Sequence, residues 1–496
     1  MAKKVAQRAL ILQGGGALGA YEAGVIKALA NNLADEDKKN GYSDRPLFDI
    51  VAGASIGAVN ATLLVSHVLD KLREKPRPSH SECWLAAVDK LEKFWKQEVA
   101  NYTFLDYPLL KMGMDWWWGN ARNLGDKSKE YWKNFFKTYS NQVEFRKSWP
   151  FLWWYFAWPD NYSPVASGEA ARRYFSYMNS AVYSGIPGVL TAGIPQPGDM
   201  KFLSPSSLFW RFDNTPGAIT VKRHWIKDGP YIRTEAGEPR LLLVAVDVQD
   251  CTTAVTFDSY PKKGGKRFSE YGGDRTRHVI EYDGIAVDHV VASMSTNQRY
   301  EFPGMKTTDG QERRFWDGAY LSNTPLREVL QSHRDYWSKV RPGDDVPDLE
   351  IYVVNLYPSL EAEVPQEPDS IQDREIDIKF HDRTRYDLKV AQVATDYIDL
   401  VNELVQLARE NKLSKKAEAI LDRPAKSKKR DGTARKYRDL LEGRFAIKRA
   451  IYVEREDDKD TILGKAFDFS GSSIISLFEK GEVAGKRAIE RDSAET

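Results

Sequence analysis

Residues 9–20 read ALILQGGGALGA, and residues 47–58 read LFDIVAGASIGA. In each stretch a short apolar run, typical of a buried strand, ends at a glycine and leads into a segment with the apolar spacing of a helix. The two helices are expected at Leu18–Leu33 and from Ala58 to about Leu69. Strand, helix, strand and helix in series predict an α/β fold built on a parallel sheet.

The composition is that of a folded, globular chain. Of its 496 residues, 42% are hydrophobic, and 72 Lys and Arg balance 71 Asp and Glu to a formal net charge of +1. This balance gives no global field for nucleic acid, so we expect no nucleic-acid partner. Cys83 and Cys251 are the only cysteines, too few for a disulfide framework. The N-terminal apolar stretch Ala9–Leu12 is too short for the core of a signal peptide, and no apolar window is long enough for a membrane-spanning helix. A cytoplasmic location is therefore expected, with peripheral membrane contact as a further option.

The alternation of strands and helices stops after the second helix and resumes at Leu241–Val248. We therefore expect one α/β domain in two parts, with an inserted cap and a helical C-terminal region. The predicted boundaries are residues 1–75 and 240–360 for the domain, 76–239 for the aromatic-rich cap, and 361–496 for the C-terminal region. Helices are expected there at Asp369–Asn411, Thr433–Ile451 and Ser472–Ile489.

Ser55 lies between Gly53 and Gly57, at the turn from the second strand into its helix. A serine at such a sharp turn presents its hydroxyl above the sheet edge, close to a helix N-terminus, and the glycines allow the turn to close. This context predicts a nucleophilic serine. The alternative is a serine that only caps the helix.

The glycine-rich loop Gly14–Gly16 also lies between a strand and a helix. Consecutive backbone N–H groups at a helix N-terminus can bind an anion, and the oxyanion of an acyl-transfer reaction is one such anion. Gly14, Gly16 and Gly19 also match the dinucleotide fingerprint, which requires an acidic residue about 20 positions further on. Asp35 and Glu36 are expected in a polar loop instead, so this alternative is disfavoured.

The triplet Asp317-Gly318-Ala319 follows an apolar run and precedes a turn. An aspartate at a strand end, with glycine permitting the turn, is well placed to face the same crevice as Ser55. The alternatives are an ordinary turn aspartate or a Ser–His–Asp triad. Seven histidines exist, none of them in a recognised catalytic motif: His67, His80, His224, His278, His289, His333 and His381. No metal-binding spacing occurs either, so neither a metal nor another cofactor is expected.

Three motifs, GGGALG at 14–19, GASIG at 53–57 and DGA at 317–319, together resemble the patatin-like phospholipase family. Asn323-Thr324-Pro325 and the block Val290–Pro303 also match, and the resemblance covers about residues 8–69 and 240–330. It implies a patatin-like parallel-sheet sandwich with helices on both faces. Leu18 is a departure, because many members carry Arg or Lys there.

The resemblance also implies a function. The protein would be a carboxylic ester hydrolase acting on lipids through a Ser55–Asp317 dyad, with the amides of Gly14, Gly15 and Gly16 as its oxyanion hole. The dyad members would be separated by 262 positions (317 minus 55) because of the inserted cap. A non-catalytic nucleotide- or lipid-binding module using the same glycine loop is the alternative from another class.

Ten of the 14 tryptophans lie between Trp84 and Trp158, and the run Trp149–Pro159 reads WPFLWWYFAWP. Such crowding predicts a cap with its own core, an acyl pocket, or a peripheral membrane contact. The tract Lys426–Arg438 holds seven basic residues against Asp431. It is expected to be a solvated loop, with an anionic membrane surface as the alternative.

Overall fold

The computed structural model describes most of the chain outside the aromatic-rich segment. The described residues are 5–42, 44–100, 212–262, 265–273, 276–295, 302–341, 346–361, 364–365, 368–381, 384–428, 434–441, 445–456 and 464–495, with scattered residues between 173 and 192. The tryptophan run Trp149–Pro159 lies outside them.

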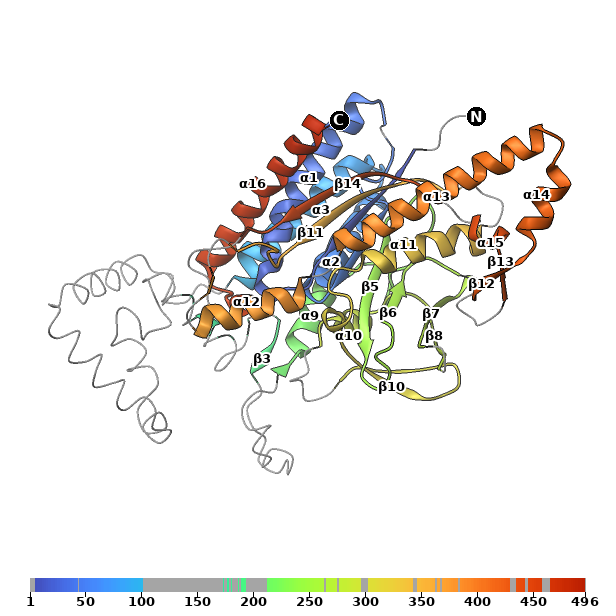
Figure 1. The fold of residues 1–496 in the computed structure, drawn as a ribbon. Helices are drawn as coiled ribbons and strands as arrows, with labels where there is room; N and C mark the ends of the chain where they lie inside the picture. Colours follow the sequence, from blue (N-terminus) through green and yellow to red (C-terminus); the bar gives the residue numbers. More distant parts are fainter. Residues whose placement is uncertain are drawn as a thin grey trace, which may run out of the picture.

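An eight-stranded sheet forms the centre of the molecule, with the strand order β14-β11-β1-β2-β5-β10-β9 and with β6 paired to β5 (Figure 1). The strands are β1 (Gln7–Leu12), β2 (Ile50–Ala54), β5 (Arg240–Asp247), β6 (Val255–Asp258), β9 (Gly304–Lys306), β10 (Glu312–Asp317), β11 (Leu349–Asn355) and β14 (Ile447–Glu454). The run from β14 to β5 is parallel, whereas β6, β9 and β10 pair in antiparallel fashion. The predicted parallel sheet is confirmed for this run.

Helices cover both faces of this sheet. The helices have the bounds α1 (Gly19–Lys39), α2 (Ile56–Leu72), α3 (His80–Lys93), α9 (Thr215–Arg223), α10 (Val287–Ser293), α11 (Leu326–Asp335), α12 (Pro368–Phe380), α13 (Thr384–Glu410), α14 (Ser414–Leu421), α15 (Arg438–Leu441) and α16 (Gly471–Glu495). One core contains side chains of α1, α2, α3 and α16, and the other contains those of α11 and α13. Short helical segments occur at η1 (Gly16–Leu18), η2 (Phe94–Val99), η8 (Gly318–Tyr320), η9 (Tyr336–Val340) and η10 (Lys465–Phe467). Three small pairs lie outside the sheet: β3 (Thr191–Ala192) with β4 (Phe212–Asp213), β7 (Arg267–Tyr271) with β8 (His278–Tyr282), and β12 (Pro424–Lys428) with β13 (Ala434–Lys436).

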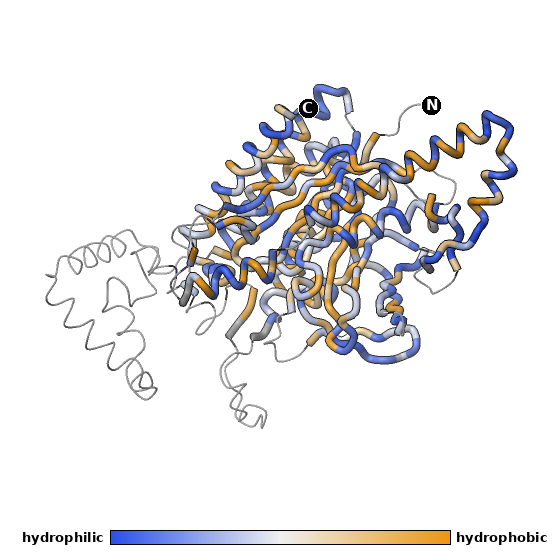
Figure 2. Tube along the Cα trace, in the orientation of Figure 1, coloured by the Kyte–Doolittle hydropathy of each residue, from blue (hydrophilic) through white to orange (hydrophobic). Residues whose placement is uncertain are grey.

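The alternation of side chains along each strand builds two hydrophobic cores. In β1, Leu10 and Leu12 join the core formed with α1, α2, α3 and α16, whereas Ala9 and Ile11 join the core formed with α11 and α13. Successive side chains of a strand point to opposite faces, so a sheet buried on both sides has nearly continuous apolar strands. Figure 2 shows hydrophobic strands at the centre of the molecule. The sheet sandwich with helices on both faces, which the family resemblance implies, is confirmed.

The C-terminal region is built into this sandwich. Strand β14 extends the sheet beside β11, and α16 packs along α1 (Figure 1). This helix pair is close, because a Cβ on Gly24 would lie 2.0 Å from the carbonyl oxygen of Phe478, and one on Gly481 equally near that of Tyr21. Glycine is therefore needed where the two helix backbones meet.

Several local predictions are wrong. The helix expected at Thr433–Ile451 is instead β13, α15 and part of β14, because residues 447–454 pair with β11. The run Asp369–Asn411 is two helices, α12 and α13, rather than one. The basic tract Lys426–Arg438 contributes strands to the β12–β13 hairpin instead of forming only a loop.

In the part of the predicted cap that the structure describes, α3 and η2 pack on the main core. Trp84 and Trp95 are fully buried there. No helix among the described residues is both long and apolar enough to cross a membrane.

Candidate active site

Ser55 occupies a strained turn between β2 and α2. Its φ and ψ angles are 54° and −122°, a combination that is costly for a residue with a side chain. The turn is also tight, because a Cβ on Gly53 would lie 2.3 Å from the carbonyl carbon of Gly57. The Ser55 hydroxyl makes no capping hydrogen bond to α2. The helix-cap alternative is therefore wrong.

The hydroxyl of Ser55 instead points to Asp317, at the end of β10. The distance from Ser55 Oγ to Asp317 Oδ2 is 2.5 Å, and Oδ1 accepts a hydrogen bond of 2.9 Å from the Ala319 N–H. Strand β5 brings the two residues together, because Ala54 pairs with Val244 and Asp317 with Ala245. Two side chains 262 positions apart thus meet across one strand.

Asp317 is buried, with 7% of its surface exposed. Burial raises the pKa of this carboxyl to about 6, although hydrogen bonds from the Ser55 hydroxyl and the Ala319 amide favour the charged form. A carboxylate with a raised pKa is a stronger base than an exposed aspartate. Near neutral pH it is still largely ionised, so it can accept the serine proton.

Ser293, the last residue of α10, is a supporting residue that the sequence motifs do not single out. Its Oγ accepts a hydrogen bond of 3.2 Å from the Ser55 N–H and donates one of 2.6 Å to the carbonyl oxygen of Val244. Ser293 thus ties the strained Ser55 backbone to β5. Ser293 lies in the block Val290–Pro303, and the similarity of this block to the patatin-like family is the one sequence feature that points to it.

The glycine loop lies against Ser55. A Cβ on Gly14 would lie 2.9 Å from the Cβ of Ser55. The Gly14 N–H donates to Asn323, at 3.0 Å to Oδ1 and 3.2 Å to the backbone oxygen. Across the described part of the chain, the N–H groups of Gly15 and Gly16 have no hydrogen-bond partner. These two amides are therefore the ones available to an anion.

Gln13 and Asn323 join this loop to α12. The Gln13 amide donates to Thr324 Oγ1 at 2.8 Å and to the carbonyl oxygen of Phe380 at 3.2 Å, and Asn323 Nδ2 donates to the same carbonyl at 3.0 Å. Phe380 is the last residue of α12. A residue of the C-terminal region thus holds both the glycine loop and the loop after Asp317.

The seven histidines, all of them in described ranges, have contacts away from the dyad. His67 lies against His224, His80 against Arg77, His224 also against Glu98, His278 against Asp250, His289 against the Ala286 N–H, His333 against the Pro347 carbonyl, and His381 against the Tyr357 carbonyl. None hydrogen-bonds to Ser55 or Asp317. The geometry therefore favours a dyad over the Ser–His–Asp alternative.

The dinucleotide alternative also fails. Asp35 and Glu36 lie in the last turns of α1, rather than in the expected loop. Glu36 pairs with Arg449 at 3.2 Å. The end of β2, where an acid should meet the ribose, carries Ser55. Among the described residues no group of three or more metal-ligating side chains occurs.

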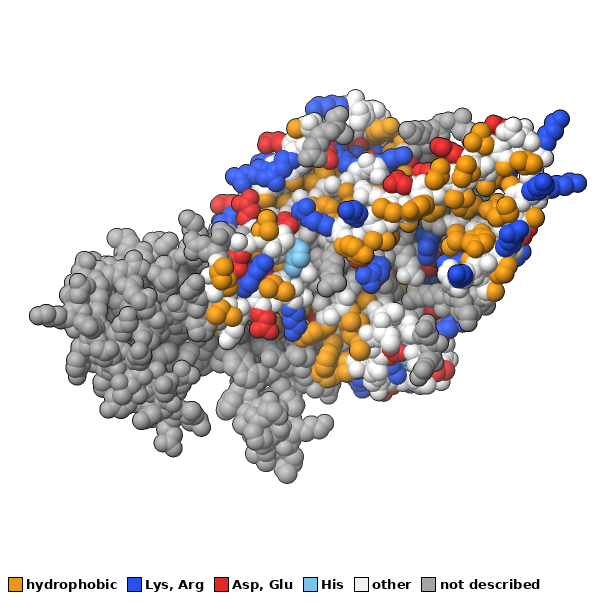
Figure 3. Space-filling model, viewed as in Figure 1, with side chains coloured by type: hydrophobic (Ala, Val, Ile, Leu, Met, Phe, Trp, Pro, Cys, Tyr) orange, Lys and Arg blue, Asp and Glu red, His pale blue; other side chains and the backbone are white. Residues whose placement is uncertain are grey.

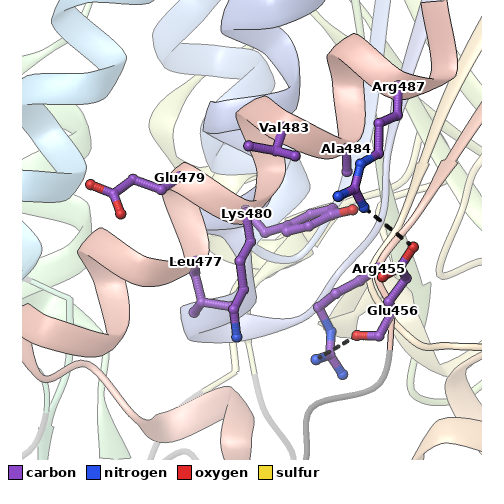
Figure 4. A pocket seen from close by; sticks show the side chains of 9 residues that line it. Arg455, Glu456, Leu477, Glu479, Lys480, Val483, Ala484 and Arg487 are labelled. Atoms are coloured by element: carbon purple, nitrogen blue, oxygen red, sulfur yellow. Dashed lines mark hydrogen bonds and ion pairs between the residues drawn. The ribbon is translucent and has the colours of Figure 1, made fainter. Parts of the chain in front are cut away.

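A pocket of about 320 Å³ lies between α1, α16 and the end of β14 (Figure 4). It is lined by Tyr21, Arg455, Glu456, Leu477, Glu479, Lys480, Val483, Ala484 and Arg487. Neither dyad residue is part of this lining. Arg455 Nε donates to the carbonyl oxygen of Leu356 at 2.7 Å, and a Cβ on Gly15 would lie 2.6 Å from the Leu356 side chain. Arg455 therefore supports the glycine loop indirectly, through Leu356.

Three comparisons with known proteins were made. The structure is similar to the crystal structure of VipD from Legionella pneumophila, with a TM-score of 0.27 and 12% sequence identity over 96% of this chain and 67% of that chain. No curated protein matches the chain. The sequence model of patatin-like phospholipases matches residues 10–330, which contain both Ser55 and Asp317. Because this match covers more than half of the sequence, the chain belongs to the patatin-like phospholipase family.

Proposed function

We propose that this protein hydrolyses carboxylic esters of lipids through a Ser55–Asp317 dyad. Membership of the family implies lipid acyl hydrolysis in general, and the geometry of the two side chains supports the specific assignment. The observation that carries it is the 2.5 Å hydrogen bond from a conformationally strained serine to a buried carboxylate. Strain of this kind is characteristic of functional sites.

The dyad supplies the chemistry in two steps. Ser55 Oγ attacks the ester carbonyl carbon while Asp317 Oδ2 takes the serine proton, and the resulting tetrahedral intermediate collapses as Asp317 protonates the departing alcohol. The acyl group is then bonded to Ser55. Water attacks this acyl-enzyme, Asp317 takes a proton from the water, and the same proton returns to Ser55 Oγ as the acid leaves.

The amides of Gly15 and Gly16 would bind the oxyanion in both tetrahedral intermediates. Fixed backbone donors in a site of low polarity stabilise such a charge without reorganising, and losing one donor typically costs ~10²–10³ in rate. Gly14, the first member of the predicted oxyanion hole, has its N–H engaged by Asn323. We assign to Gly14 the role of fixing the loop against Ser55, and to Gly15 and Gly16 that of donating.

The substrate would be a lipid or another acyl ester, and the Trp-rich segment would provide a peripheral membrane contact. Tryptophan favours the boundary between membrane and water. The run Trp149–Pro159 is apolar but too short to span a bilayer.

Labelling with a fluorophosphonate probe tests this function directly. The wild-type protein should react at Ser55, and the Ser55→Ala variant should not. The matched variant Ser338→Ala, at a half-buried serine of η9 whose hydroxyl donates to the Arg334 carbonyl oxygen, should react like wild type. A non-catalytic binding module has no activated serine. Absence of labelling in the folded wild-type protein would therefore exclude the proposed hydrolase.

A further inference from the structure

Helix α13 carries an apolar stripe that no described element covers. Its seven large side chains are between 45% and 67% exposed: Tyr386, Val390, Val393, Tyr397, Leu400, Leu404 and Leu407. Figure 3 shows hydrophobic side chains gathered along this helix on the face toward the viewer. Leu388, on the other side of the helix, is buried in the core that includes α11, and Ile398 is buried as well. The stripe is thus the outer face of a helix that is already anchored.

The spacing within this stripe is that of a coiled coil. From Tyr386 to Leu407 the intervals alternate strictly between four and three residues, which is the repeat of positions a and d in successive heptads. A helix that lies on a sheet or a membrane usually has a broader apolar face. A strict repeat of 3.5 residues over three heptads instead matches the seam between two helices.

The charges beside the stripe argue against a lipid surface. Asp396, Glu403 and Glu410 occupy one flank at heptad spacing, and Lys389 is the only basic residue in that row. An anionic membrane would repel this flank. The other flank begins with Asp387, which pairs with Arg327 at 3.2 Å. It continues with Ala394, Val401 and Ala408, whose short side chains allow another helix to approach closely.

We propose that two copies of this chain associate through α13 as an antiparallel coiled coil. If Val390 packs opposite Leu407 of the partner subunit, then Val393 meets Leu404 of the partner subunit and Tyr397 meets Leu400 of the partner subunit. The two-fold axis repeats each contact. The seven exposed side chains offer on the order of 700 Å² per copy, close to the ~800 Å² per partner of a specific interface.

Ion pairing at the two ends of the stripe favours the antiparallel direction. In this register Lys389 lies opposite Glu410 of the partner subunit, at both ends of the interface. In a parallel pair the same flank would face the small residues, and Lys389 would lie near Ala394 of the partner subunit. The inner positions are less favourable, because Asp396 lies opposite Glu403 of the partner subunit. Replacing Glu403 by Lys should therefore tighten the dimer.

The test is sedimentation equilibrium of the full chain over a range of concentrations, without lipid. Wild type should be dimeric at high concentration. Lys389→Glu and Glu410→Lys should each weaken the dimer by roughly tenfold in Kd, because two ion pairs become repulsive. The double variant should restore the wild-type Kd, and Glu403→Lys should lower it.

Four outcomes would overturn the proposal. These are a monomer at every concentration, single charge changes without effect, a double variant weaker than either single one, or a dimer that dissociates when its α13 stripe binds phosphatidylcholine vesicles. Leu400→Asp should abolish the dimer whichever way the helices run, so it separates a coiled coil of either direction from association elsewhere on the surface. Hydrolysis of a soluble short-chain ester by each variant shows that the fold is intact, because α13 contributes no residue to the proposed dyad or oxyanion hole.

Discussion

Asp317 links the proposed chemistry to pH. Burial raises its pKa to about 6, and only the ionised form can take the serine proton. We therefore expect kcat/KM for a soluble short-chain ester to rise with pH through an apparent pKa near 6 and then to level off. A profile that is flat between pH 4.5 and 8 would contradict the assignment of Asp317 as the base.

The same shift affects stability with a definite sign. Because the pKa of the Asp317 carboxyl is higher in the folded state than in the unfolded chain, the folded protein loses stability as pH rises from about 4 to 6. The loss is about 1.4 kcal/mol per pH unit. Asp317→Asn removes this loss. It should therefore inactivate the protein yet raise its free energy of unfolding at pH 7 relative to wild type, with little gain at pH 4. Urea denaturation of both proteins at the two pH values measures the difference.

Variants of the two dyad residues and of the seven histidines distinguish a dyad mechanism from a triad mechanism. Ser55→Ala and Asp317→Asn should each lower kcat by at least ~10³, because no other side chain replaces the nucleophile or its base. Each of the seven single His→Gln variants should keep appreciable activity. A folded His→Gln variant as inactive as Ser55→Ala would show that a triad operates.

Individual site residues differ in how far the sequence predicts them. Ser55 and Asp317 lie in short local motifs, since a tight turn needs glycine neighbours, and their meeting in the structure agrees with that interpretation. Ser293 and Asn323 act through contacts 238 and 309 positions away. No local pattern encodes such a contact, and serine and asparagine are common in ordinary turns.

At the scale of elements, a buried polar cluster joins α1, α2 and η2 beneath the glycine loop. Glu22 Oε2 accepts from Asn60 Nδ2 at 2.9 Å, and Trp95 Nε1 donates to Asn60 Oδ1 at the same distance. Glu22 is fully buried, and burial raises the pKa of its carboxyl well above the usual range, although the Asn60 and Gln13 hydrogen bonds oppose this. Burial therefore favours the neutral form of this carboxyl.

Glu22→Gln tests this cluster. Wild type should lose stability as pH rises above about 4.5, because Glu22 must stay protonated, whereas the glutamine variant lacks this loss. The difference in free energy of unfolding, variant minus wild type, should grow as pH rises above about 4.5, by at most about 1.4 kcal/mol per pH unit. Glu22→Ala, the control, should be destabilised at every pH by the cavity it leaves. A difference independent of pH would contradict a neutral Glu22.

The elements nearest the motifs are those that the sequence predicts best. The segments β1, α1, β2 and α2 have apolar runs bounded by glycine, and only their ends shift. Strand β14 is missed because residues 447–454 mix charged and apolar side chains, of which Ile451 and Val453 are buried. Its pairing with β11 decides its conformation, and such long-range pairing overrides local preference.

At the scale of the whole molecule, segments remote in sequence complete the fold around the site. Strand β14 and α16 belong to the main sandwich, and the Phe380 carbonyl of α12 accepts from Gln13 and Asn323. Residues beyond 360 thus help to hold the glycine loop in place. A truncation at residue 360 would remove a sheet strand, the partner of α1 and these two hydrogen bonds together.

The Trp-rich segment offers the last prediction, which rests on sequence alone because residues 149–159 lie outside those the structure describes. If this segment meets the lipid interface, replacing Trp153 and Trp154 by Ala should depress hydrolysis of vesicle lipid at least ~10-fold more than that of a soluble short-chain ester, because two interfacial anchors are lost. The matched double change to Phe keeps the apolar rings but not the indole N–H, so it should retain part of the vesicle activity. Equal losses on both substrates would point to a damaged cap core or acyl pocket. No loss on either, in a folded protein, would leave the tryptophans only a packing role.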